Sequence, residues 1–203
     1  MSFFDSLKNA ALSALKRESR KTVNKTVNTA INNIGKGRNH TEKFTFEALP
    51  TNVDELKALP EAKMDTAFKT TALTILALSR YEADPEATYA MLSFLKGPEE
   101  FNTSEKNFMK DRLTGKEYKV RSFFEGATPD NDYTPNKPYV ISVIENPYSF
   151  DNENWATLYV PSGGADNPRN IKLRKKPSTG EWFLNDIQCL GDIRLPKSED
   201  KWA

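Results

Sequence analysis

The stretch from residue 171 to residue 196 limits what this chain can fold into more than any other part of it. Within it, an extended run (IKLRKK) is followed by residues typical of tight turns (PSTG) and by a second extended run that holds Trp182 and Phe183. Two such runs around a turn predict a β-hairpin anchored by two aromatic side chains. The chain therefore contains an antiparallel sheet, although a hairpin indicates no reaction.

The rest of the chain changes from helical to extended patterns at about its midpoint. Apolar side chains at helical spacing predict helices at residues 66–82, from Pro85 to Gly97 and from Asn102 to Gly115, with a short one after Asn52. Extended patterns predict strands at residues 139–145, 154–160, 170–175 and 181–187, with shorter runs at 44–46 and 118–124. The order indicates an α+β fold of about three helices packed on an antiparallel meander of four to six strands.

Charge divides the chain into two parts. Residues 1–40 hold eight Lys or Arg and two acids, a net charge of +6, while the other 163 residues hold 21 basic and 26 acidic residues, a net charge of −5. Two apolar stripes at helical spacing lie within residues 2–34, on either side of a polar run. We therefore expect a basic amphipathic helical arm with a linker over 1–40 and a globular domain over 41–203.

A basic amphipathic helix suits an acidic or anionic surface. We expect residues 1–34 to contact a protein partner or a second copy, with an anionic membrane surface as the alternative. The net negative charge of the globular part disfavours nucleic acid. The candidate contact residues of the arm are Lys16, Arg17, Arg20, Lys21 and Lys25. A lone cysteine, Cys189, and the lack of a long apolar run indicate a cytoplasmic protein, with a peripheral place at the inner membrane face as the alternative.

Several short segments of the sequence together form a pattern that is typical of a protein family. They include FKTTALTILAL, EATYAMLSFLKGPE, RSFFEGATPDNDYTP, STGEWFLNDI and DIRLPKSEDKWA. Over about residues 44–203 the chain resembles an uncharacterised family of cytoplasmic proteins from gut Firmicutes, a domain of unknown function. The resemblance implies a bacterial, cytoplasmic protein and supplies no activity or catalytic residue. More distantly, a curved meander that ends in this hairpin is similar to cone-shaped NTF2-like domains.

Common catalytic constellations are missing from the sequence. His40 is the only histidine and Cys189 the only cysteine, so neither a nucleophile–histidine pair within the core nor an ordinary zinc site can be built. No dinucleotide-binding, P-loop or EF-hand motif occurs. We expect no cofactor, no metal and no catalytic residue, which favours a protein that is not an enzyme.

A few polar segments leave a choice between a structural and a functional role. Carboxylates at Asp130, Asp132, Glu145, Asp151 and Glu153 could bind a hard cation or act as acid and base, but turn formation is favoured. The Ser162-Gly163-Gly164 segment could bind phosphate, but a hairpin loop is favoured. Lys172, Arg174 and Lys176 alternate and could form an anion-binding or RNA-binding face, but a solvated face is favoured.

The favoured function is a non-catalytic binding or adaptor domain that carries the basic arm. The alternative is a cone-fold small-ligand binder or enzyme, with a pocket between the helices and the sheet. The candidate ligand-binding residues are Arg121, Tyr133, Arg174, Trp182 and Arg194. Trp202 is expected to dock on its own domain, with capture of a partner as the alternative.

Overall fold

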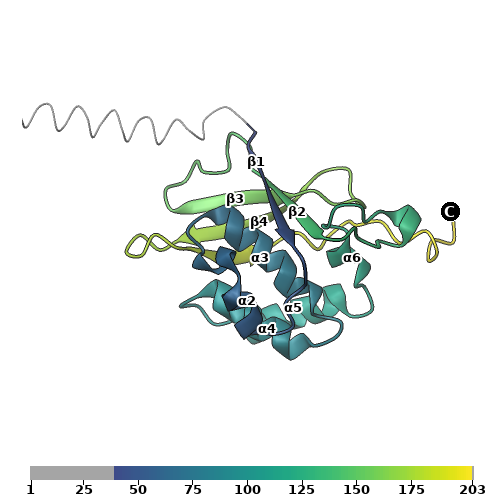
Figure 1. Ribbon diagram of the computed structural model, residues 1–203, viewed down its shortest axis with the longest axis horizontal. Coiled ribbons are helices and arrows are strands. Elements are labelled where there is room, and N and C mark those ends of the chain that lie inside the picture. The colour runs from purple at the N-terminus through teal and green to yellow at the C-terminus, as the bar shows by residue number, and fades with distance from the viewer. Residues whose placement is uncertain (1–38, 203) are drawn as a thin grey trace, which may run out of the picture. The chain divides into compact units, whose positions relative to one another are not determined.

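The computed structural model describes residues 39–202 of the chain (Figure 1). The predicted helical arm lies outside the described residues, and so do its candidate contact residues Lys16, Arg17, Arg20, Lys21 and Lys25. Its amphipathic character and its contacts therefore stay predictions.

Five antiparallel strands form one sheet in the order β1-β2-β3-β4-β5. They are β1 (Thr41–Phe46), β2 (Tyr139–Ile144), β3 (Trp155–Val160), β4 (Arg169–Lys175) and β5 (Trp182–Ile187). Strands β1 and β2 pair over six residues, whereas β2 pairs with β3 at Ile144 and Tyr159. The predicted hairpin is confirmed as β4 and β5, and β5 is an edge of the sheet.

Five α-helices lie between β1 and β2 in the described chain. They are α2 (Val53–Ala58), α3 (Ala67–Ser79), α4 (Pro85–Lys96), α5 (Thr103–Leu113) and α6 (Tyr118–Arg121), with 3₁₀ turns η1 (Pro60–Lys63) and η2 (Pro129–Asn131). The predicted α+β class is confirmed. No helix of residues 39–202 combines the length and apolar content needed to cross a bilayer.

Helix α3 forms the centre of the fold (Figure 1). Its residues from Ala67 to Leu78 are buried except Lys69, and it contacts every strand of the sheet. Its threonines remain satisfied because Thr71 and Thr74 donate hydrogen bonds to carbonyls one turn earlier, at 2.9 and 2.8 Å. Helix α3 therefore covers the inner face of the sheet.

The prediction of an extended run at residues 118–124 is wrong. Backbone hydrogen bonds from Arg121 to Glu117 and from Ser122 to Tyr118 make this segment helical, and only Phe124 forms an isolated β-bridge, with Ile141. The buried residues Val120, Phe123 and Phe124 have the i, i+3, i+4 spacing of a helix. Burial of one helical face therefore decides the structure here.

The prediction that Trp202 docks on its own domain is also wrong, because its side chain is 96% exposed. The preceding residues are fastened to η2, where the Lys197 N–H donates to the Pro129 carbonyl at 2.9 Å. The Trp202 N–H then donates to the Asp200 carboxylate at 2.9 Å. This local turn leaves the indole ring in solvent.

Candidate functional site

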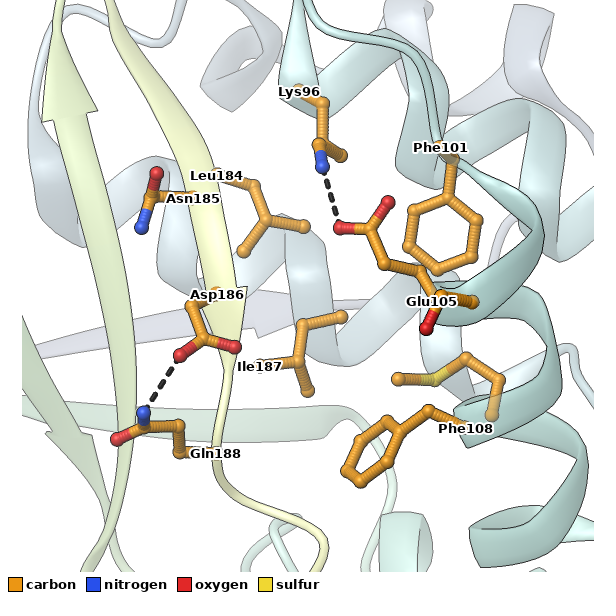
Figure 2. Close-up of a pocket in the computed structure, with 11 residues that line it drawn as sticks. Lys96, Phe101, Glu105, Phe108, Leu184, Asn185, Asp186, Ile187 and Gln188 are labelled. Atoms are coloured by element: carbon orange, nitrogen blue, oxygen red, sulfur yellow. Dashed lines mark hydrogen bonds and ion pairs between the residues drawn. The ribbon is translucent and has the colours of Figure 1, made fainter.

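A cleft of about 420 Å³ opens between helix α5 and the edge strand β5 (Figure 2). Its apolar lining consists of Phe101, Phe108, Met109, Leu184 and Ile187. Figure 2 shows Leu184 and Ile187 pointing from the strand towards the helix. Phe108 is 40% exposed, so an aromatic ring stands at the mouth of the cleft.

A glycine brings the end of α4 onto β5 beside the cleft. Gly97 caps α4 with a φ of 68°, a conformation that favours glycine. A Cβ atom at this position would lie 2.3 Å from the ring of Phe183. The missing side chain therefore lets the aromatic ring of β5 pack directly on the helix end.

The start of α5 is held to the end of α4 by one carboxylate. Asn102 and Glu105 form a capping box, in which Glu105 Oε2 accepts the Asn102 N–H at 2.8 Å. Glu105 Oε1 accepts a hydrogen bond from Lys96 Nζ at 2.5 Å. The Lys96 side chain is only 6% exposed, and its Nζ lies 5.9 Å from the Phe101 ring centroid. A charged pair is thus built into the wall of an apolar cleft.

The buried ammonium retains capacity for a ligand. A lysine ammonium has three donors, and Glu105 is the acceptor that it uses within the described residues. Buried lysine is rare unless it is paired, because removal of the charge from water is costly. Lys96 can therefore donate to an oxygen of a bound group without losing the carboxylate that stabilises it.

A second pocket of about 270 Å³ adjoins the first along β5, and both are lined by Lys96, Leu184 and Asn185. Its other walls are the end of α4 and the β4–β5 hairpin, with the basic residues Arg174, Lys175 and Lys176. Glu99 offsets part of this charge, at 3.5 Å from Arg174 Nη1. The two pockets form one groove, which we call the β5 groove, with an apolar half and a basic half.

The free side of β5 is occupied at its beginning. The Trp182 N–H donates to the Met64 carbonyl at 2.8 Å, and the Trp182 carbonyl accepts from Thr70 Oγ1 at 2.7 Å. Further along, the pairing with β4 shifts register, which leaves Asn185 without a residue opposite it. Bulges discourage the addition of another strand to a sheet edge. The groove therefore suits binding of side chains better than strand pairing.

The five predicted ligand-binding residues fall into two separate groups. The first group, on the β4–β5 hairpin, is Arg174 and Trp182, and the second, outside this hairpin, is Arg121, Tyr133 and Arg194. Arg174 lines the basic half of the groove and lies over the Trp155 ring at 5.1 Å, and Trp182 is the first residue of β5. Tyr133 is fully buried and its hydroxyl donates to the Arg194 carbonyl at 2.8 Å.

The charged members of the second group are held by acidic neighbours. Arg121 Nη2 pairs with Glu117 at 2.7 Å, one turn earlier, and the Arg194 guanidinium pairs with Asp166. The predicted set therefore does not share one pocket, and Arg174 is its member in the β5 groove.

Sequence reasoning missed Lys96, Glu105 and Phe108 as members of a site. The capping box of Asn102 and Glu105 was predictable, because its residues are three apart. The bond from Glu105 to Lys96 depends on how α5 folds back on α4, which no local pattern shows. A lysine in the last turn of a helix is usually only a partner of the helix dipole.

Two of the other predicted polar segments have structural roles, the loop with Asp130 and Asp132 and the glycine loop. Asp130 pairs with Lys197 at 3.3 Å, and Asp132 accepts from the Ser198 hydroxyl at 2.8 Å. In the glycine loop, the Gly163 N–H is already bonded to the Ser122 carbonyl at 2.8 Å. Within residues 39–202, no three His, Cys, Asp or Glu side chains gather as they would around a metal ion.

Burial shifts the pKa of several titratable groups, among them Cys189 and Glu145. Cys189 is fully buried, and desolvation raises the pKa of its thiol to about 12, so it packs as a small apolar residue. Glu145 is also buried, and desolvation raises the pKa of its carboxyl group above its usual value, partly offset by His40. Neither group lines the β5 groove.

Comparison with known proteins gives a family and no activity. Residues 48–197 match the model of a family described as Domain of unknown function (DUF6935). No protein with a curated description and no solved structure matches the chain.

Proposed function

The chain belongs to this family of domains of unknown function, and we propose that it is a non-catalytic binding module that holds an apolar side chain of a protein partner in the α5–β5 cleft. The observation that carries the proposal is an open cleft that is lined by five apolar side chains and holds the buried Lys96, paired with the partly exposed Glu105. Recognition sites typically combine an apolar pocket of this size with a few fixed polar groups.

The chemistry of the cleft supports binding rather than reaction. Its charged side chains are bonded within the domain, since Lys96 pairs with Glu105 and Asp186 accepts from Gln188 Nε2 at 2.6 Å. No hydroxyl or thiol nucleophile is paired there with a general base, as covalent catalysis would require. A small-ligand binder or enzyme is the alternative, and it would use the same cleft.

Replacement of Phe108 by aspartate is expected to weaken partner binding strongly without unfolding the domain. A random peptide library displayed on phage would be selected on the full-length protein, and enriched peptides would be synthesised and measured by calorimetry. We expect enriched peptides with a large apolar residue, and at least about a tenfold rise in Kd for F108D, as for a central interface residue. The melting temperature should change little, because Phe108 is 40% exposed.

Leu195→Asp is the matched control, because Leu195 is 47% exposed and does not line the cleft. It should leave the Kd of each peptide unchanged. The proposal is overturned if no peptide is enriched, or if the enriched peptides bind F108D as tightly as the unchanged protein. Enrichment that is lost equally in both variants would also count against the cleft.

The proposal includes the predicted basic arm and the setting of the protein. We propose that residues 1–34 contact a protein partner, a second copy or an anionic membrane surface, in the cytoplasm of a bacterium such as a gut Firmicute. The net charge of +6 over residues 1–40, against −5 for the rest, supports the role of the arm, and the family resemblance implies the bacterial setting.

Deletion of residues 1–38 is expected to leave a folded, monodisperse domain that differs from the full chain in assembly state or in flotation with anionic vesicles. Light scattering after gel filtration measures the first property, and flotation at low and high salt measures the second. Neutral vesicles are the control, because charge attraction acts only on the anionic ones. Identical behaviour of the two proteins in both assays would refute a role for the arm.

A further inference from the structure

The most exposed large apolar side chain of the described residues is Trp202, at 96%. It follows Glu199, Asp200 and Lys201, so residues 199–202 present two carboxylates, one ammonium group and an indole ring, with a net charge of −1. Solvent exposure of a whole indole ring forgoes the gain from burial of a large aromatic surface. This segment has the features of a ligand.

The β5 groove has the complementary features. Its apolar half is lined by Phe101, Phe108 and Met109, and its basic half by Arg174, Lys175 and Lys176. We infer that the β5 groove receives residues 199–202 of a second copy of this chain, with Trp202 in the apolar half and the two acids against the basic half. This inference rests on the proposed binding function of the cleft, and it names the partner.

Size and hydrogen bonding both favour an indole ring in the apolar half. A cleft of about 420 Å³ can accept a large aromatic side chain, and the rings of Phe101 and Phe108 offer edge or face contacts to it. The indole N–H needs an acceptor when it is buried. The carboxylate of Asp186 lines the same cleft and can supply one.

The spacing of the segment matches the groove. Asp200 precedes Trp202 by two residues, and when the bond of its carboxylate to the Trp202 N–H opens, the extended chain spans roughly 7 Å over that distance. The two halves of the groove are direct neighbours, because both are lined by Lys96, Leu184 and Asn185. An acid two residues before the indole can therefore reach the basic half while the ring fills the apolar half.

A second copy is the occupant that fits, because the segment is tied down on its own domain. The Lys197 N–H donates to the Pro129 carbonyl, and Ser198 Oγ donates to Asp132 at 2.8 Å. Held in this way, Trp202 is not covered by residues 39–201 of its own chain. Contact between the segment of one copy and the groove of the next joins different surfaces, so copies associate head to tail into rings or chains.

Sedimentation equilibrium of the full-length protein, from about 1 to 200 µM, tests the inference across the usual range of weak association. The average mass should rise with concentration. Trp202→Ala removes the ligand and Phe108→Asp removes the pocket, so each variant alone should need at least about tenfold higher concentration to associate. Leu195→Ala, an exposed apolar residue outside the groove, should behave like the unchanged protein.

Mixing the two defective variants gives the sharpest result. W202A keeps an intact groove and F108D keeps an intact segment, so an equimolar mixture should form one-to-one dimers and stop there. A monomeric protein at all concentrations, association unchanged in W202A, or a mixture that stays monomeric would overturn the inference. Docking of Trp202 on its own domain would appear as the first of these outcomes. If library peptides still bind the cleft, the proposed function stands while the second copy is excluded as the partner.

Discussion

Replacement of Gly163 by alanine is expected to destabilise the domain by about 2–4 kcal/mol, because overpacking against rigid atoms is among the costlier single changes. A Cβ atom at this position would lie 1.9 Å from the carbonyl oxygen of Ala127 and 3.0 Å from its carbon. These are backbone atoms, so no side-chain rotation can relieve the clash. The Gly163 N–H also donates to the Ser122 carbonyl at 2.8 Å, and a shift of the loop would break this bond.

Gly191→Ala is the matched control. A Cβ atom there meets nothing within 4 Å, and the residue has no positive φ. Its effect should stay within about 0.5 kcal/mol, as at an ordinary surface position. Urea unfolding followed by circular dichroism measures the free energy of unfolding of both variants. In a thermal scan, the melting temperature of G163A should fall by roughly 4–16 °C. Equal stability of the two variants would show that the β3–β4 loop can move away, contrary to its close packing.

The sequence was informative where short-range chemistry decides the structure. The side chain that caps each of α2, α4 and α5 accepts a hydrogen bond from a backbone N–H two or three residues later; these caps are Asn52, Asp84 and Asn102. The starts of these helices could therefore be predicted from a few neighbouring residues. The β4–β5 hairpin was predictable for the same reason, since its turn residues lie between two extended runs.

The sequence was misleading where distant contacts decide. Residues 118–124 could alternate as a strand, but burial of Val120, Phe123 and Phe124 on one side selects a helix and a turn. An exposed tryptophan is costly, which favoured docking of Trp202, yet hydrogen bonds of the preceding residues fix the segment in another place. The first outcome depends on which side chains the rest of the fold buries, and the second on the bond of Lys197 to the distant Pro129.

The candidate site was predictable only in part. Arg174 could be selected because alternation along a strand puts basic side chains on one face. Two tertiary contacts lie along the β5 groove, the packing of Phe183 on Gly97 and the bond of Lys96 to Glu105. Each of these contacts joins residues from different elements, so the spacing of residues along the sequence does not indicate it. Basic residues such as Arg121 and Arg194 looked similar in the sequence but pair with nearby acids elsewhere.

Replacement of Tyr133 by alanine is expected to cost about 3–5 kcal/mol of stability, the range for removal of a buried aromatic side chain. Tyr133 is fully buried, and its ring centroid lies 5.7 Å from that of Tyr118. Its hydroxyl donates to the Arg194 carbonyl at 2.8 Å and fills the space above Gly164. A ligand-binding tyrosine would instead be replaceable with loss of binding and little loss of stability.

Tyr133→Phe separates packing from the hydrogen bond. It keeps the ring but leaves the Arg194 carbonyl without its donor, so it should cost only about 1 kcal/mol. Tyr148→Ala is the control, because Tyr148 is 75% exposed and its loss should stay within about 0.5 kcal/mol. Urea unfolding of the three variants measures these free energies. If Y133A were stable but had lost ligand binding, the result would support Tyr133 as a ligand-binding residue. The expected order, with alanine far below phenylalanine, would instead make it the residue that joins the η2 loop to the segment before Trp202, and so a determinant of where that segment is presented.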